Sequence, residues 1–269
     1  DVYKRQKVSI AALIAAGVVP AVILTLCNLA AAYFVARSRG YPAGTFPGWH
    51  IVLRSLVAAA PGLFVVVLII TGILSGVFTA TESAAVAVLY ALALTVFVYR
   101  SLTWDQFVRA ASKAVKTTGV VLLLIGISAT FGYLISFYGV AEKTGELMAS
   151  VSTSPWAIFL MVNIILFVLG TFLDMAATIL ICTPIFLPIC MQYGMGPVQF
   201  GIVMLLNCAL GLNTPPVGTT QFVGCAIGGV SVGTVMRTIW PFYGALLAAL
   251  ALVTYVPAFS LWLPGVLLN

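Results

Sequence analysis

The sequence predicts an all-α membrane protein that crosses the bilayer several times. Of its 269 residues, 62% are hydrophobic and only 7% are charged, whereas a soluble domain carries about 25% charged residues. Its apolar residues form runs of the length that a membrane-spanning helix needs, about 17 to 25 residues. The basic residues gather at the ends of these runs, as in short cytoplasmic loops. A soluble secreted enzyme is excluded, and the chain has no basic arm for nucleic acid.

The N-terminal half contains four predicted spans. They cover residues 8–36, 61–77, 83–99 and 117–138. A loop rich in proline and glycine, residues 41–49, follows the first span. Residues 102–109 place apolar side chains at helical spacing with Arg109, Lys113 and Lys116 off that face. This pattern predicts a separate helix that lies along the membrane interface.

The C-terminal half is less regular. A hairpin (155–191) is interrupted at residues 170–174, and a broken helix (197–229) is interrupted at residues 211–218. A long final span covers residues 231–263. Basic residues of short loops favour the cytoplasmic side of the membrane. If Arg37 is cytoplasmic, most of the basic residues lie on that side only when the hairpin enters and leaves the membrane from the opposite side. The sequence therefore predicts a re-entrant hairpin followed by a broken helix that crosses.

The two interruptions are candidate ligand sites, because non-helical backbone at membrane depth must be buried in protein or line a polar cavity. Pro215 and Pro216 remove two amide donors and free carbonyl groups upstream. These carbonyls, with the side chains of Thr171, Asn213 and Thr214, offer the oxygen ligands that an alkali cation needs. The helix that starts after Pro216 directs its positive end at an anion. A proline kink without any ligand is the alternative.

Asp174 is the only acidic residue deep in an apolar stretch. A charge there costs at least about 2.5 kcal/mol, so it needs a cation, a donor or water. A compatible alternative is that Asp174 caps the helix that begins at Met175. Glu82 is expected to cap the third span, and His50 to lie in the interfacial loop. The five cysteines are interpreted as buried hydrophobic residues rather than disulfides or metal ligands.

Four segments resemble the large membrane subunit (DctM type) of tripartite ATP-independent periplasmic (TRAP) transporters. Two are the motifs Leu-Gly-Thr-Phe-Leu-Asp (169–174) and Gly-Leu-Asn-Thr-Pro-Pro-Val-Gly (211–218), and the others are residues 76–90 and 183–188. The resemblance extends from about Val8 to the C-terminus. It implies an elevator-type fold of the ion-transporter superfamily, with two inverted repeats that each contain a re-entrant hairpin and a broken helix.

The resemblance also implies a function and a location. We expect a multi-pass protein of the bacterial inner membrane that uses sodium to import an organic acid, such as a C4-dicarboxylate or sialic acid. A periplasmic binding protein would deliver the substrate, and a small four-helix membrane subunit would brace the scaffold. Sodium is the coupling ion, and no cofactor is expected.

The implied sites lie at the two interruptions. The expected sodium site comprises Gly170, Thr171, Asp174, Gly211, Asn213, Thr214, Pro215 and Gly218. The expected wall of the substrate site comprises Asp174, Asn213, Thr214, Pro216 and Thr219. Asn213 stands where the family often has an apolar residue.

The resemblance divides the chain into four parts. Residues 1–7 are expected to be a non-native or disordered start, and residues 8–54 the closing helix of a missing first repeat with a cytoplasmic loop. Residues 55–116 would form scaffold helices and the interfacial arm, and residues 117–269 the second repeat. The first and last spans begin alike, with Val-Ser-Ile (8–10) and Val-Ser-Val (230–232), which supports this division. Chance similarity between apolar segments is the alternative. The chain is therefore expected to be a partial subunit that does not transport alone.

Three other functions are alternatives. The chain could belong to a binding-protein-independent anion or carboxylate permease of the same superfamily, or to a scaffold subunit that does not transport. A membrane enzyme is disfavoured. An intramembrane aspartyl protease needs two membrane carboxylates, and only Asp174 qualifies. A zinc protease needs a His-Glu-x-x-His motif, which a single histidine excludes.

Overall fold

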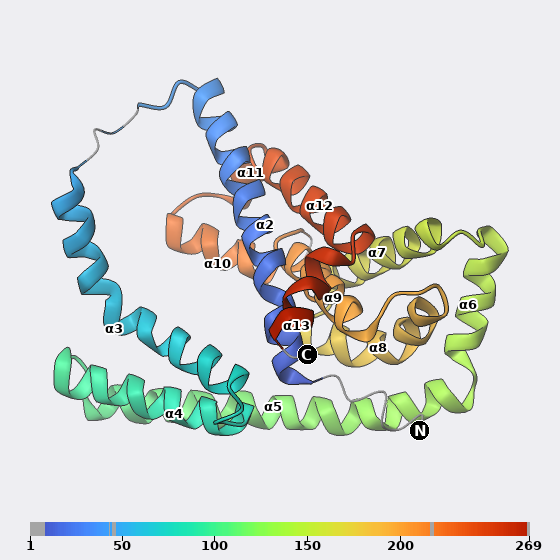
Figure 1. Ribbon diagram of the computed structural model, residues 1–269, viewed down its shortest axis with the longest axis horizontal. Helices are drawn as coiled ribbons and strands as arrows, with labels where there is room; N and C mark the ends of the chain where they lie inside the picture. Colours follow the sequence, from blue (N-terminus) through green and yellow to red (C-terminus); the bar gives the residue numbers. More distant parts are fainter. Residues whose placement is uncertain (1–8, 43, 45–46, 216–217, 268–269) are drawn as a thin grey trace. The chain divides into compact units, whose positions relative to one another are not determined.

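The computed structural model describes residues 9–42, 44, 47–215 and 218–267, and these residues form helices joined by turns. Among them, six helices are long and apolar enough to cross a bilayer, or seven if one bent pair counts as a span. This confirms an all-α polytopic membrane protein. The chain divides into two compact units: a larger unit of residues 1–39 and 120–269, and a smaller unit of residues 40–119. Each unit is drawn in Figure 1.

The smaller unit is built on a pair of helices, α3 (Trp49–Leu74) and α4 (Ala80–Ala93), the latter extended by the π-helical turn η1 (Leu94–Val98). The hydroxyl of Tyr90 on α4 donates to the carbonyl of Pro61 on α3 at 2.9 Å. Thr79 and Glu82 form a reciprocal capping box at the start of α4, which confirms the predicted role of Glu82.

The start of α3 corrects the sequence prediction. The second span was expected to begin at residue 61, but the helix begins at Trp49 and continues through Pro61. His50 and Arg54 therefore lie in a helix and not in a loop. A proline inside an apolar helix does not mark the start of the helix, because membrane helices tolerate proline where neighbouring groups satisfy the freed backbone.

Helix α5 (Trp104–Phe137) is continuous over 34 residues. The expected interfacial arm and the expected fourth span are therefore one helix, and the prediction of two separate elements is wrong. The charged side chains of Arg109, Lys113 and Lys116 are all exposed on it. Polar residues alone do not end a helix, and Gly119, which follows the basic stretch, lowers the helix propensity without ending the helix. At 1.5 Å per residue the helix is about 51 Å long, well beyond the hydrocarbon core of about 30 Å.

The larger unit is organised around α9 (Pro197–Leu212). In Figure 1, α9 lies among α2 (Ile10–Ser38), the hairpin helices α7 (Pro155–Phe172) and α8 (Met175–Gln192), and α12 (Trp240–Tyr255). Its most extensive contact is with α7. The core between these helices includes the buried side chains Ile158, Val162, Leu166, Phe200 and Val203. A short helix, α6 (Val140–Val151), precedes the hairpin and exposes Glu142, Lys143 and Glu146.

The expected final span is broken twice. The structure has α11 (Val232–Met236), α12 and α13 (Ala258–Leu267) where one helix was predicted, with a bend of 59° between α12 and α13. The second break has a clear cause, because Pro257 disfavours helical backbone at the preceding Val256, whose φ and ψ are −119° and 91°. By contrast, α2 passes through Pro20 without interruption, so the segments after Ser9 and Ser231 differ in shape.

Candidate functional site

Both predicted interruptions are present, and both are shorter than the sequence suggested. In the hairpin, α7 continues to Phe172 and α8 begins at Met175, so only Leu173 and Asp174 lie outside the helices. In the broken helix, α9 continues to Leu212 and α10 (Thr219–Gly228) follows. The expectation that residues 170–172 and 211–212 are unwound is wrong, since glycine permits an irregular backbone but does not impose one.

A glycine contact holds the two interruptions together. A Cβ atom added to Gly211 of α9 would lie 2.7 Å from the Cα of Gly170 on α7 and still closer to its carbonyl group. No side chain fits there, so the two backbones touch directly, as small residues allow between membrane helices. Leu173 and Asp174 follow closely after Gly170, and Asn213 follows closely after Gly211. The ends of α7 and α9 therefore meet at the same place.

Asp174 caps α8. Its carboxylate accepts from the backbone N–H of Ala176 at 3.1 Å, and its carbonyl accepts from the Thr178 hydroxyl at 3.0 Å. This confirms the capping alternative. The residue is exposed in the chain considered alone. A capping carboxylate oxygen keeps further lone pairs for a cation, so the cap does not exclude a ligand role.

Three polar side chains at the interruptions donate within their own helices. Thr171 donates to the carbonyl of Val168 at 2.8 Å, and Thr214 to that of Leu210 at 2.8 Å. The amide group of Asn213 donates to the Ala209 carbonyl at 2.9 Å. These bonds use the hydrogens and leave the side-chain oxygens as acceptors. The arrangement is suited to a ligand that is positively charged or donates hydrogen bonds.

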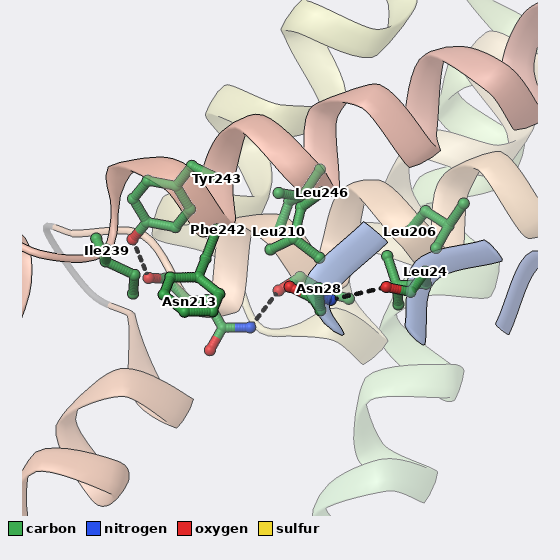
Figure 2. A pocket seen from close by; sticks show the side chains of 10 residues that line it. Leu24, Asn28, Leu206, Leu210, Asn213, Ile239, Phe242, Tyr243 and Leu246 are labelled. Carbon is green, nitrogen blue, oxygen red and sulfur yellow. Dashed lines mark hydrogen bonds between the residues drawn. The ribbon is translucent and has the colours of Figure 1, made fainter. Parts of the chain in front are cut away.

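The backbone carbonyl of Asn213 is already occupied. It accepts a hydrogen bond from the hydroxyl of Tyr243, a buried residue of α12, which Figure 2 shows directed at Asn213. This bond uses one lone pair of the carbonyl, and the second lone pair stays available to a cation. The sequence analysis missed Tyr243, because nothing in an apolar helix indicates which distant carbonyl a tyrosine will reach.

A cavity of about 500 Å³ lies beside this interruption. Figure 2 shows Asn213 on its wall with Asn28 of α2, whose side-chain amide donates to the Leu24 carbonyl at 3.0 Å. Most of the other lining residues are apolar: Leu206, Ala209, Leu210, Ile239, Phe242 and Leu246. Among the described residues that line it, none is basic, so these residues offer no cationic partner for a carboxylate.

The remaining predicted site residues are placed as follows. Pro215 and Gly218 are described, and Gly218 precedes α10 with a φ of 25°. Pro216 lies outside the described residues, as does the side chain of Thr219, whose backbone begins α10. Asp174, Asn213 and Thr214 are therefore the members of the predicted substrate wall that can be compared with the structure.

A buried polar network links α7, α9 and α12, and the sequence analysis missed it. The amide of Asn207 donates to the Asn163 side-chain oxygen at 2.6 Å, and the amide of Asn163 donates to the Thr254 hydroxyl at 3.2 Å. Gln199 donates to the Thr254 carbonyl at 2.9 Å. Carboxamides inside apolar helices are costly unless they are paired, so Asn163, Gln199 and Asn207 were the available signal.

The cysteines and acidic residues add little to the site. Cys182, Cys190, Cys208 and Cys225 are buried, as predicted, whereas Cys27 is only half-buried. Within the described part of the chain, no group of three or more His, Cys, Asp or Glu side chains could hold a metal ion. Any cation at the interruptions would therefore depend on hydroxyl, carboxamide and carbonyl oxygens around Asp174.

Two interrupted helices packed together in a chain of membrane-length helices define a protein of the secondary-transporter class. The sequence profile described as "Tripartite ATP-independent periplasmic transporter, DctM component" matches residues 2–259. The chain belongs to this family, which confirms the resemblance. Family membership and the membrane-length helices identify a multi-pass protein of the bacterial inner membrane.

Named relatives agree with this assignment. The chain is 37% identical to the C4-dicarboxylate TRAP transporter large permease protein DctM of Pseudomonas aeruginosa, over 96% of this chain and 60% of that protein. It is 34% identical to the sialic acid TRAP transporter large permease protein SiaM of Vibrio cholerae, over 97% of this chain and 61% of that protein. The chain thus spans about 60% of the length of these relatives. Both are named as permeases, which supports the prediction that the chain is not an enzyme.

Proposed function

We propose that this chain is part of the large permease subunit of a sodium-coupled transporter that imports an organic acid delivered by a periplasmic binding protein. The observation that carries the proposal is the contact between Gly170 and Gly211, which brings two helix interruptions together. Relatives named for C4-dicarboxylate and sialic acid transport support an acidic substrate.

Electrostatics favour a cation at this contact. The C-terminal ends of α7 and α9 both lie there, and each helix end carries a partial charge of roughly −0.5. The oxygen atoms of Thr171, Thr214 and Asp174 lie next to these ends in the sequence. Sodium is the cation that such uncharged oxygens with one carboxylate would accept, as in other broken-helix sites.

The same interruptions favour an anion on their other side. Helices α8 and α10 begin directly after the breaks, and the first amide groups of a helix attract negative charge. A carboxylate substrate placed against them would lie next to the bound cation, so each ion would stabilise the other. Because no basic side chain lines the cavity beside Asn213, a further partner for the carboxylate would come from the rest of the subunit.

The proposed partners are a periplasmic binding protein and a small four-helix membrane subunit. Family membership supports both. The exposed apolar side chains on α3 and α4, which include Leu56, Val57, Val88 and Leu89, support a lipid or subunit neighbour for the smaller unit.

The test is transport by the complete protein. Full-length permease with its small subunit would be reconstituted into liposomes, and uptake of labelled C4-dicarboxylate or sialic acid measured with the loaded binding protein outside. We expect uptake to require both an inward sodium gradient and the binding protein. Uptake that persists without the binding protein would indicate the independent permease. Stable assembly without uptake of any organic acid would indicate a scaffold subunit, and uptake without sodium would overturn the proposed coupling.

A further inference from the structure

Gln221, in the first turn of α10, has a buried side-chain oxygen without a partner. The residue is 6% exposed, and its Oε1 atom accepts no hydrogen bond from the part of the chain that the structure describes. Its Nε2 atom donates only to the sulfur of Met236, at 3.1 Å, and a thioether is a weak acceptor. A buried carbonyl oxygen without a hydrogen-bond partner is destabilising, so this position calls for a ligand.

The unpaired oxygen lies close to Gly218, at a position where a Cβ atom would be crowded. A Cβ atom added to Gly218 would lie 3.4 Å from Gln221 Oε1 and 3.1 Å from the carbonyl oxygen of Thr214. Two carbonyl oxygens, one from a side chain and one from the backbone, therefore border the same small space. This space lies at the interruption between α9 and α10, where Thr214 follows the end of α9.

Rotating the Gln221 carboxamide does not give its oxygen a hydrogen-bond donor. Turning the carboxamide by half a turn would place Nε2 on the side of Gly218, where Oε1 now lies, but it would then place Oε1 against the sulfur of Met236, which is also an acceptor. Each orientation therefore leaves an oxygen facing another electron-rich atom. A small cation beside Gly218 satisfies both oxygens at once.

We propose that Gln221 Oε1 is a sodium ligand at the interruption, acting together with the Thr214 carbonyl beside Gly218. This inference rests on the proposed sodium coupling and adds a side chain that was not among the predicted site residues. The ligand is uncharged and forms part of a buried wall, so it selects for a cation without holding it irreversibly. Gln221 is thus a specificity-determining residue.

The experiment measures sodium-dependent thermal stability of the purified full-length protein, with choline chloride keeping the ionic strength constant. Gln221→Leu removes the oxygen. Gln221→Asn shortens the side chain by one methylene group and so moves the oxygen away from the site. We expect each to raise the half-saturating sodium concentration about tenfold, the effect of losing one favourable contact. Thr220→Ala is the control, since Thr220 is exposed on the same turn, and it should leave the sodium response unchanged.

Gln221→Glu tests the orientation of the side chain. With a cation between the oxygens, the added charge should lower the half-saturating sodium concentration. If Nε2 instead donates to Thr214, the carboxylate would repel that carbonyl and lower the melting temperature at every sodium concentration. That result would overturn the inference, as would leucine and asparagine variants with wild-type sodium responses. A wild-type protein that sodium does not stabilise would overturn the proposed function as well, so the two failures are distinguishable.

Discussion

The helices of the larger unit bury more of their surface within their unit than the helices of the smaller unit do. A third of the apolar window of α7 is buried in the larger unit (33%), against 6% for α3 and for α4 with η1 in the smaller unit. In a membrane, apolar contact alone drives little association, and helices are joined by small residues and polar bonds. The larger unit has both, at Gly170–Gly211 and Asn163–Asn207. The comparison teaches that the region with the interruptions fixes its own geometry, while α3 and α4 depend on neighbours.

The largest expected effect comes from filling the glycine contact. Gly211→Ala would place a methyl group against the backbone of Gly170, and since backbone cannot move aside as a side chain does, we expect a loss of about 3 kcal/mol or more. Thermal unfolding of the purified full-length protein measures it. Gly224→Ala is the control, because nothing lies near Gly224, and it should be neutral or slightly stabilising. Equal melting of Gly211→Ala and wild type would show that α7 and α9 are less closely packed.

The second effect comes from the buried network. Asn207→Leu would leave the Asn163 oxygen without its donor at 2.6 Å, which should cost about 1–3 kcal/mol. The double variant with Asn163→Leu should lose less than the sum of the two single variants, because the partners are removed together. Additive losses would contradict the bond. Thr25→Val, which removes only an exposed bond within α2, should change stability little.

The third effect separates capping from ion binding at Asp174. Asp174→Ala should lower stability by about 1 kcal/mol through loss of the cap, whereas Asp174→Asn keeps a capping oxygen. Thermal unfolding distinguishes them. Sodium-dependent uptake should nevertheless weaken in Asp174→Asn, because the charge is lost. If uptake and its sodium dependence stay at wild-type values, Asp174 is a cap alone.

The smallest effect compares the same substitution in the two units. Tyr90→Phe removes a bond to Pro61 in the smaller unit, and Tyr243→Phe removes one to Asn213 in the larger unit. Each should cost about 0.5–1.5 kcal/mol in thermal unfolding. Only Tyr243→Phe should also alter the half-saturating sodium concentration, since only its partner lies at an interruption. If Tyr90→Phe changed the half-saturating sodium concentration as much as Tyr243→Phe, hydrogen bonds in both units would affect the sodium response.

The interruptions were predictable because their signals are local. The prolines after Thr214 and the capping residue Asp174 indicate a break in a helix whatever the neighbouring helices are. Their extent was not predictable, since whether Gly170 and Gly211 unwind or pack depends on the facing helix. The continuity of α5 and the bend near Pro257 were missed because hydropathy alone does not separate a span from a break.

Tertiary pairing was beyond local signals. Gln221, Asn207 and Tyr243 were all visible as polar groups among apolar residues, but their partners lie on other helices or across a turn. A carboxamide in an apolar stretch indicates that a partner exists without indicating which one. The predicted site was therefore right in its segments and incomplete in its side chains.

Helix α5 carries one further consequence. Its residues run from the smaller unit into the larger unit without a break. The backbone has left-handed residues just outside both ends, at Arg100 (φ 48°) and Gly139 (φ 60°). At Arg100 this conformation is costly for a residue that carries a Cβ atom. Replacing Arg100 with glycine would therefore relieve this cost, whereas Gly139 already adopts its left-handed conformation without it.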